Sequence, residues 1–186
     1  MEYVILGLLM IRARTLYEIN KILETRVALF YSASFGSISS AIAKLLEKGW
    51  ISVQEQVEQG RNKKRYAITP AGAAAFTEWL GSPIPGEKMK DHALTRLFCL
   101  GFLAPHERVA LITSHITKLE ALAADLATLA ETSRTLDAPA PLHAMVRFQM
   151  LTLQYGQDYY AFSIAWFKRL LADLEEEIRD QDAPGA

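Results

Sequence analysis

A single stretch, from Gly36 to Gly72, constrains the fold of this chain more than any other segment. It contains, in order, an amphipathic helix, a glycine, a run of alternating polarity, a basic segment, and a second run that leads into another helix. Alternating polarity marks a half-buried strand, and glycine after a helix marks its C-terminal end. This is the order of a recognition helix followed by a β-hairpin wing. We therefore predict a winged helix-turn-helix domain that binds DNA.

The helix of this stretch is expected from about Phe35 to Lys48, with Ser34 as its N-cap and Gly49 as its stop. Its inner side is aliphatic and comprises Ile38, Ile42, Leu45 and Leu46. The opposite side is small and polar, and its candidate DNA-binding residues are Ser37, Ser39, Ser40 and Lys44. Small side chains let a helix approach base edges closely, and serine hydroxyls donate or accept hydrogen bonds there. A plain solvated helix face would have the same composition.

The wing is expected to consist of two strands joined by a basic tip. Ile51, Val53 and Val57 should point inward from the first strand, and Tyr66 and Ile68 from the second. The candidate phosphate-binding residues at the tip are Arg61, Lys63, Lys64 and Arg65. Cations at the tip of a hairpin can follow phosphates or enter a minor groove. Runs of charge are usually just solvated, but this one lies one hairpin away from a small-faced helix, which favours nucleic acid.

Helices are expected on both sides of this stretch. Residues 3–11 form a short apolar helix, and Thr15 with Glu18 has the spacing of a capping box for the next one. Thr69 should cap a helix after the wing, with Pro70 at the first helical position, where proline is favoured. The buried side of that helix is expected to include Ala74, Ala75 and Trp79.

Residues 81–86, Gly-Ser-Pro-Ile-Pro-Gly, form the one clear linker. We therefore expect a DNA-binding domain over 1–80 and a helical domain over 87–182. Residues 1–80 contain ten Lys and Arg against seven Asp and Glu, whereas residues 81–186 contain ten against fourteen. A basic front half and an acidic rear half suit a protein that presents one end to a polyanion.

The rear half is expected to be entirely helical. One apolar helix should cover 88–103 and bury the single cysteine, Cys99. A long helix should then run from Pro105 to about Thr132, and its apolar residues are spaced alternately by three and four, as in a coiled coil. These residues are Val109, Ile112, Ile116, Leu119, Ala123, Leu126 and Ala130.

The last helix, expected over 142–181, has two apolar stripes. One comprises Val146, Leu153, Tyr160, Phe167, Leu171, Leu174 and Ile178. The other, called the outer stripe below, comprises Met145, Phe148, Tyr155, Tyr159, Phe162 and Trp166. A helix that is apolar on two sides must be covered on two sides. The preceding long helix covers one of them, so we expect a second copy of the chain to cover the other.

Four aromatic residues of this half and one from the end of the front half are also candidates for a pocket that binds a small aromatic or phenolic effector. These candidates are Trp79, Phe148, Tyr155, Tyr159 and Trp166. Aromatic walls with phenolic hydroxyls suit aromatic ligands. The same residues would serve equally as the core of a dimer.

Several function classes are disfavoured. The apolar N-terminus is too short for a membrane span and lacks a basic flank, so we expect a cytoplasmic protein. His92, His106, His115 and His143 show no metal-ligand spacing, and neither a phosphate loop nor a nucleophile elbow is present. We therefore expect no enzyme, no metal and no cofactor.

The front of the chain resembles the PadR family of bacterial transcriptional regulators. The residues that carry this resemblance are Leu6-Gly7-Leu8-Leu9, Tyr17-Glu18-Ile19, Phe30-Tyr31-Ser32-Ala33-Ser34-Phe35-Gly36-Ser37-Ile38, Leu45, Gly49, Ile51, Gly60-Arg61, Tyr66-Ala67-Ile68-Thr69 and Gly72. The helix layout of the rear half is similar to that of the longer PadR subgroup, whose C-terminal dimerisation domain is related to a virulence-activator module.

The resemblance implies a winged helix-turn-helix dimer, usually a repressor, that binds a palindromic operator and is released by a small effector. The sequence departs from the family where Ser39 and Ser40 replace a common Tyr-Pro, where Asn62 replaces a frequent proline, and where Leu16 replaces a frequent glycine. The first departure removes an aromatic residue that often contributes at the DNA surface in the family. The alternative is a winged-helix adaptor that binds proteins and no DNA, which would leave the basic wing tip without a role.

Overall fold

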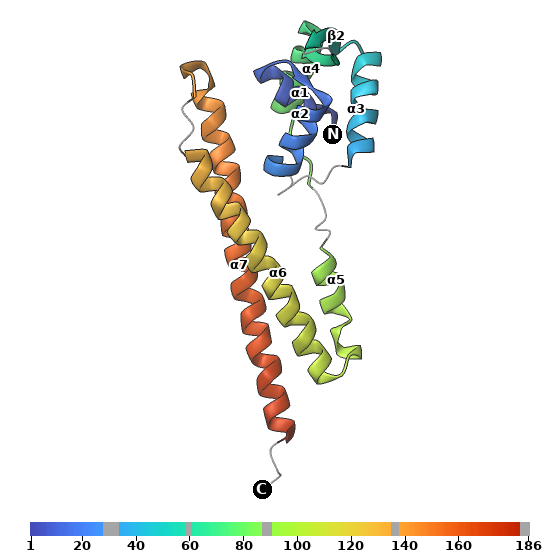
Figure 1. Cartoon of the computed structure of the whole chain (residues 1–186). Coiled ribbons are helices and arrows are strands. Elements are labelled where there is room, and N and C mark those ends of the chain that lie inside the picture. Colours follow the sequence, from blue (N-terminus) through green and yellow to red (C-terminus); the bar gives the residue numbers. More distant parts are fainter. Residues whose placement is uncertain (28–33, 59–60, 87–90, 135–137, 183–186) are drawn as a thin grey trace. The chain divides into compact units, whose positions relative to one another are not determined.

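The computed structural model describes residues 1–27, 34–58, 61–86, 91–134 and 138–182, without the side chains of 26–27, 56–58, 61–62 and 182. The chain divides into two compact units, Met1–Glu87 and Lys88–Ala186, called the front and rear units below. Figure 1 shows both, and each is described by itself. No helix in the described ranges is long and apolar enough to cross a membrane.

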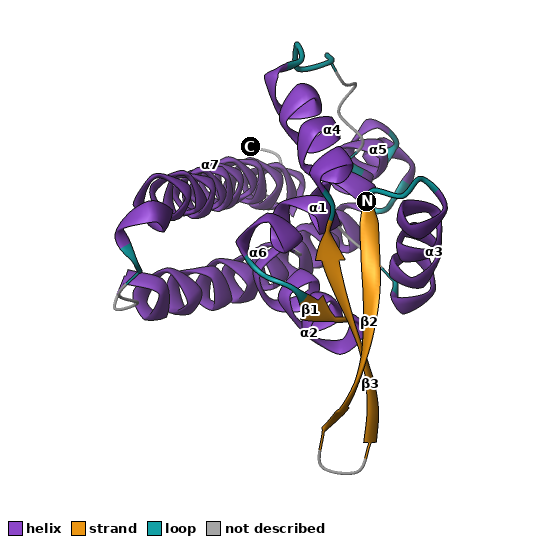
Figure 2. Cartoon of the chain, turned by 90° about the horizontal axis from the view of Figure 1, so that it is seen from above, coloured by secondary structure: helices purple, strands orange, loops and turns teal. Residues whose placement is uncertain are grey.

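The front unit is a winged helix-turn-helix, as the sequence predicts. Its helical segments are α1 (Glu2–Ile11), α2 (Leu16–Ile22), the π-helical turn η1 (Leu23–Val27), α3 (Phe35–Glu47) and α4 (Pro70–Gly81). Its strands are β1 (Arg14–Thr15), β2 (Ile51–Glu58) and β3 (Arg61–Ile68), which form an antiparallel sheet in the order β1-β3-β2. Figure 2 shows that the β2–β3 hairpin, the wing, extends beyond the helices of this unit.

The predicted helix caps are confirmed. Thr15 and Glu18 form the capping box: the Thr15 side chain accepts from the Glu18 amide at 3.2 Å, and the Glu18 carboxylate accepts from the Thr15 amide at 2.7 Å. Ser34 and Thr69 cap α3 and α4 through their side chains alone, which accept from the amides of Ser37 and Gly72. These bonds satisfy amides that have no partner within the first turn of a helix. They fix where α2, α3 and α4 begin.

Two glycines shape the joint between α3, β2 and α4. Gly49 follows α3 with a φ of 66°, a left-handed conformation that favours glycine. Gly72 is buried in the first turn of α4, and a Cβ there would lie 2.0 Å from the Trp50 carbonyl oxygen. Thr69 reinforces the joint, since its amide donates to the Trp50 carbonyl at 3.0 Å and its hydroxyl to the Gly49 carbonyl at 2.8 Å. The first turn of α4 is therefore held against the end of α3.

The core of the front unit is fully enclosed by its own elements. Its most deeply buried side chains are Ile5, Leu6, Ile19, Leu23, Ile38 and Leu45. They come from α1, α2, η1 and α3, and β2 and β3 add Ile51 and Tyr66. Arg14 is also buried, and its Nε donates to the Leu8 carbonyl at 3.3 Å. The inner side predicted for α3 is confirmed, with Leu46 at its half-buried edge.

Three sequence predictions for the front unit are wrong. Val53 is exposed, because β2 is an edge strand and leaves the core after Ile51. Ala74 is exposed too, and Trp79 is 43% exposed. The side of α4 that faces the core instead carries Gly72 and Phe76. Trp79 is covered on one face by the Tyr3 ring, whose centroid lies 4.6 Å away in a stacked arrangement.

The rear unit consists of α5 (His92–Phe98), the 3₁₀ turns η2 (Leu100–Phe102) and η3 (Ala140–Leu142), and two long helices, α6 (Pro105–Arg134) and α7 (His143–Asp182). The single helix predicted over 88–103 is wrong. Asp91 caps α5, which ends at Phe98, and a separate turn follows. Cys99, predicted to be buried, is exposed because Leu100 fills the core position at this break.

The long helices α6 and α7 lie side by side, as Figure 1 shows. Their main core cluster includes Ile112, Ile116 and Leu119 from α6, and Phe167 and Leu174 from α7. Leu126 and Ala130 are buried farther along α6. The predicted coiled-coil-like spacing of α6 is confirmed. An ion pair at 2.6 Å between Lys168 and Glu120 joins the two helices at the surface.

The outer stripe of α7 is largely open in the single chain. Phe148 is 64% exposed, Tyr155 74% and Phe162 66%. Tyr159 is also exposed, whereas Met145 and Trp166 are half-buried. Exposed side chains of this size, aligned along one helix, form a contiguous apolar surface. The described part of the rear unit leaves that surface uncovered.

Candidate nucleic-acid interface

The outward face of α3 carries three of the four residues predicted to read bases. Ser37, Ser40 and Lys44 are exposed, while Ser39 is half-buried at the edge of the helix. Ser37 already acts in the N-terminal turn, because its hydroxyl donates to the Ser34 carbonyl at 2.7 Å. Ser40 and Lys44 are thus the clearest candidates for groove contacts on this helix.

The wing carries the predicted cations on β3. In the ladder with β2, Lys64 lies opposite Glu55 and Lys63 opposite Gln56. The Lys64 ammonium and the Glu55 carboxylate are 3.3 Å apart, and both side chains are 62% exposed. An exposed ion pair of this kind is weak and yields readily to a competing anion. Arg61 lies at the start of β3, and its side chain is outside the described part of the chain.

Arg65 has a structural contact that the sequence did not reveal. Its side chain is half-buried, and its Nη1 donates to the Ala13 carbonyl at 3.4 Å. The contact spans the pairing of β1 with β3, in which Arg65 lies opposite Thr15. Arg65 therefore joins the root of the wing to the segment that precedes α2.

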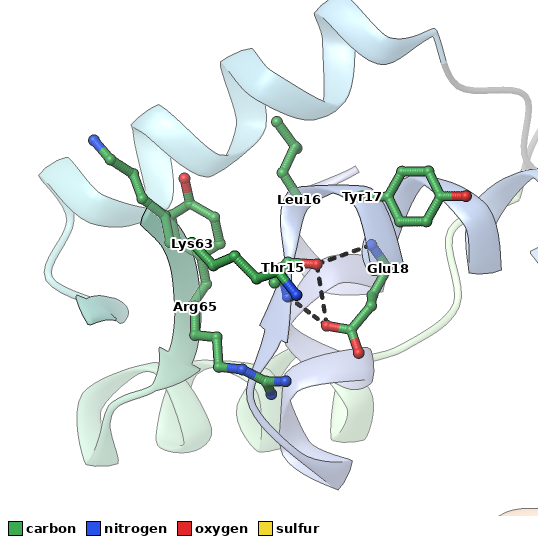
Figure 3. A pocket seen from close by; sticks show the side chains of 8 residues that line it. Thr15, Leu16, Tyr17, Glu18, Lys63 and Arg65 are labelled. Atoms are coloured by element: carbon green, nitrogen blue, oxygen red, sulfur yellow. Dashed lines mark hydrogen bonds between the residues drawn. The ribbon is translucent and has the colours of Figure 1, made fainter. Parts of the chain in front are cut away.

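A groove of about 500 Å³ lies between the first turn of α2 and β3 (Figure 3). Its lining residues are Thr15, Leu16, Tyr17, Glu18, Lys63, Lys64, Arg65 and Tyr66. Three of these side chains are cationic and one is anionic, so the groove has a positive balance. Tyr17 is 71% exposed at its edge. The exposed aromatic is a candidate contact that sequence reasoning missed, although a large aromatic on the polar side of a helix was a usable signal.

Glu18 is the one acidic residue of this groove, and its charge is held in place. Its bond from the Thr15 amide lowers the pKa of the carboxyl below its ordinary value, partly offset by burial. The Thr15 hydroxyl and the charges of Arg65 and Arg12 lower this pKa further. Arg12 lies 3.7 Å from the carboxylate. Glu18 is therefore ionised and committed to the cap.

The candidate effector residues are not gathered into one pocket of either unit. Trp79 belongs to the front unit, where it stacks on Tyr3. Phe148, Tyr155, Tyr159 and Trp166 lie along α7 in the rear unit. Trp166 packs against Phe167 beside the core. These α7 residues follow the helix as a stripe. Among the described residues no group of three or more His, Cys, Asp or Glu side chains could hold a metal ion.

Comparison with known families divides the chain much as the contacts do. Residues 5–78 match the transcriptional regulator PadR-like family, and residues 89–175 match the family described as virulence activator alpha C-term. The chain therefore contains a PadR-like domain followed by a virulence activator C-terminal domain. The PadR-like family is one of transcriptional regulators, and the resemblance found in the sequence is confirmed. Of the motif residues, Phe30–Ala33 and Gly60 lie outside the described residues.

The negative transcriptional regulator PadR of Bacillus subtilis is 24% identical over 180 residues, which are 95% of this chain and 98% of the relative. A crystal structure of that protein with operator DNA matches with a TM-score of 0.79 and covers 93% of this chain and 98% of that one, at 24% identity. A second, with p-coumaric acid, gives 0.74 at 23% identity, with 94% and 98% covered. The PadR-like regulator described here therefore shares their fold.

Proposed function

We propose that this PadR-like regulator binds operator DNA as a homodimer and represses transcription. The observation that carries the proposal is the combination of two surfaces on one unit: the small polar face of α3 and the cationic wing beside the α2 groove. An exposed helix of this kind fits a major groove, and a cationic hairpin fits the neighbouring phosphates. The operator complex of the Bacillus subtilis relative and its description as a negative regulator support the proposal.

The proposed division of labour assigns affinity to the wing and specificity to α3. Arg61, Lys63 and Lys64 hold phosphates, and Ser40 and Lys44 contact base edges, with Ser37 and Ser39 beside them. Arg65 adds its charge while holding the wing root. Phosphate contacts place a protein on the duplex without reading sequence, whereas base-edge contacts discriminate between sequences.

Dimerisation is the second part of the proposal. The outer stripe of α7 leaves Phe148, Tyr155 and Phe162 mostly exposed in the single chain, and a second copy is the occupant that we propose. Two copies related by a two-fold axis would read a palindromic operator whose half-sites lie about 34 Å apart, one turn of the double helix. The 30-residue α6 and 40-residue α7 supply the length for such an interface.

Release of the operator by a small aromatic acid is the third part. The p-coumaric acid complex of the Bacillus subtilis relative supports a ligand of this class. A ligand that binds the DNA-free state more tightly shifts the population away from the bound state. The regulator would then respond to the concentration of that acid.

The salt dependence of DNA binding tests the wing assignment. Replacing Arg61, Lys63 and Lys64 by Ala should weaken binding to every sequence and reduce the slope of log affinity against log salt by about one unit per lost phosphate contact. Fluorescence anisotropy with the DNA upstream of the chain's own gene measures both quantities. The matched control replaces three exposed cations of the rear unit, Lys118, Arg134 and Arg179, which should leave the slope unchanged.

An unchanged slope in the wing variant would reject the wing as the phosphate-binding element. If the fluorescence anisotropy of the upstream DNA does not change when the unmodified protein is added, the alternative is favoured, a winged-helix adaptor that binds proteins. Sequence specificity is measured separately. Ser40→Ala and Lys44→Ala should each alter the preferred DNA sequence, and Ser40→Ala should leave the salt slope nearly constant.

A further inference from the structure

The rear unit contains a cavity of about 340 Å³ between α5, α6 and α7. It involves none of the DNA-binding candidates, and none of the aromatic effector candidates of the sequence lines it. Its apolar wall includes Leu100, Ile112 and Phe167, all of which are buried in the rear core. The volume lies at the lower end of the range for small-molecule sites, roughly 300–1,000 Å³. A ligand of modest size would therefore fill it.

The polar side chains at this cavity are His92, Arg96 and His115, and no acidic residue lines it. Arg96 differs from Arg108 of α6, whose guanidinium lies 3.9 Å from the Glu177 carboxylate. Among the residues that the structure describes, no carboxylate pairs with Arg96. An arginine beside an apolar cavity, without an internal counter-charge, favours a planar anion that accepts two hydrogen bonds.

His115 connects the polar and apolar parts of the cavity. Its ring meets the Phe167 ring edge to face, with centroids 4.5 Å apart and planes at 81°. Aromatic pairs in this geometry are attractive and hold each other in place. Trp166 packs against the same Phe167 at 5.0 Å in a similar arrangement. The aromatic wall is thus fixed before any ligand enters.

From this arrangement we infer that the cavity binds a small monocarboxylate with an aromatic or branched apolar body. The carboxylate pairs with Arg96, and the imidazoles of His92 and His115 offer further hydrogen bonds. The apolar body lies against Leu100, Ile112 and Phe167. A role of this ligand as the effector that releases DNA would rest on the proposed function, whereas its binding to the cavity does not depend on DNA.

Isothermal titration of the full-length protein with 3-phenylpropanoate and with its neutral amide, 3-phenylpropanamide, tests the inference. The acid should bind at least about tenfold more tightly than the amide, which has the same shape without the charge. Arg96→Gln should weaken the acid about five- to tenfold and leave the amide unchanged. The expected loss of affinity is smaller than for a buried arginine–carboxylate pair, because Arg96 is exposed to solvent.

Two further variants make the outcome specific. Arg134→Gln removes an exposed arginine 19 residues beyond His115 on α6, about 28 Å away at 1.5 Å per residue, and should change nothing. Ala93→Leu, in the lining on α5, fills part of the cavity and should weaken acid and amide alike. Circular dichroism confirms that each variant is folded.

Equal binding of acid and amide, or no binding of either, would overturn the inference. The second result is the one expected if side chains of a second copy fill the cavity. DNA binding without ligand is measured separately and should be the same for Arg96→Gln and the unmodified protein. If the unmodified protein does not bind DNA, only the proposed function is contradicted, because the calorimetric titration with the acid and the amide is carried out without DNA.

Discussion

The two units of this chain bury their apolar residues in different ways. In the front unit, side chains such as Ile5, Ile19 and Leu45 are fully buried within the unit itself. In the rear unit, α6 and α7 bury one side of each other, while Phe148 and Phe162 of α7 stay mostly exposed. An open apolar stripe along a 40-residue helix is costly in water unless it is covered.

The difference shows that only the front unit encloses its own hydrophobic core. The front unit closes its core with four helices, one turn and a small sheet, and leaves polar residues on the outward face of α3. The rear unit is a two-layer structure that lacks cover on one side. In the proposed dimer its stability would depend on the partner copy, whereas that of the front unit depends on internal packing.

The largest expected effect follows from truncating a leucine in the closed core. Leu45→Ala should lower the free energy of unfolding of the front unit by about 3 kcal/mol, since the substitution leaves a cavity among fully buried side chains. Urea denaturation measures the loss. Leu122→Ala on α6, where the side chain is 48% exposed, is the matched control and should cost less than about 1 kcal/mol. Equal losses would show that Leu122 is covered in the assembled protein.

A charge in the outer stripe tests the open side of the comparison. Phe162→Glu should raise the dimer dissociation constant at least about thirtyfold, because truncating a central aromatic anchor commonly costs about 2 kcal/mol or more. Sedimentation equilibrium measures the constant. Ala161→Glu introduces the same charge at an adjacent exposed position off the stripe and should have little effect. A dimer that survives Phe162→Glu would contradict the proposed interface.

Gly72→Ala probes the joint inside the closed unit. The added Cβ would lie 2.0 Å from the Trp50 carbonyl oxygen, so the start of α4 must move, at a cost of about 1–3 kcal/mol. Gly81→Ala at the end of the same helix is the control, because a Cβ there meets nothing within 4 Å. Thermal unfolding should show a lower Tm for the first variant and an unchanged or slightly higher Tm for the second.

The smallest predicted effect concerns pH. The folded state lowers the pKa of Glu18, so its carboxylate stabilises the front unit above the unfolded value of about 4.5, and this contribution is lost as pH falls through the folded pKa. Glu18→Gln keeps the capping hydrogen bonds without the charge. Unfolding free energies of the two proteins should differ by less than about 1 kcal/mol at pH 7, and the difference should shrink as the pH falls from 4.5 through the folded pKa. A constant difference across this range would reject the electrostatic account.

Much of the fold could be predicted because local chemistry determines it. The Thr15–Glu18 capping box, the caps Ser34 and Thr69, and the stop at Gly49 each depend on residues within a few positions of one another. The spacing of α6 predicted its buried side for the same reason. The family followed from motifs that combine these local signals.

The sequence predictions failed where contacts between distant parts of the chain determine the structure. β1 is only two residues long and exists because β3 passes beside it, so no local pattern marks it. Cys99 lies in an apolar run, but a break between α5 and η2 turns it outward. The contact of Arg65 with the Ala13 carbonyl joins residues 52 positions apart. The sequence likewise could not show that Arg96 and His115 line one cavity.

The pairing of β1 with β3 has a consequence for the thermodynamics of DNA recognition. The root of the wing is held by the ladder at Arg14 and Thr15 and by the hydrogen bond from Arg65. A hairpin attached to the domain only through its two ends would lose conformational entropy when it bound a DNA duplex. Here part of that ordering has already occurred during folding. In the proposed complex, the two-residue strand β1 would therefore lower the entropic penalty of association and leave more of the phosphate attraction as net affinity.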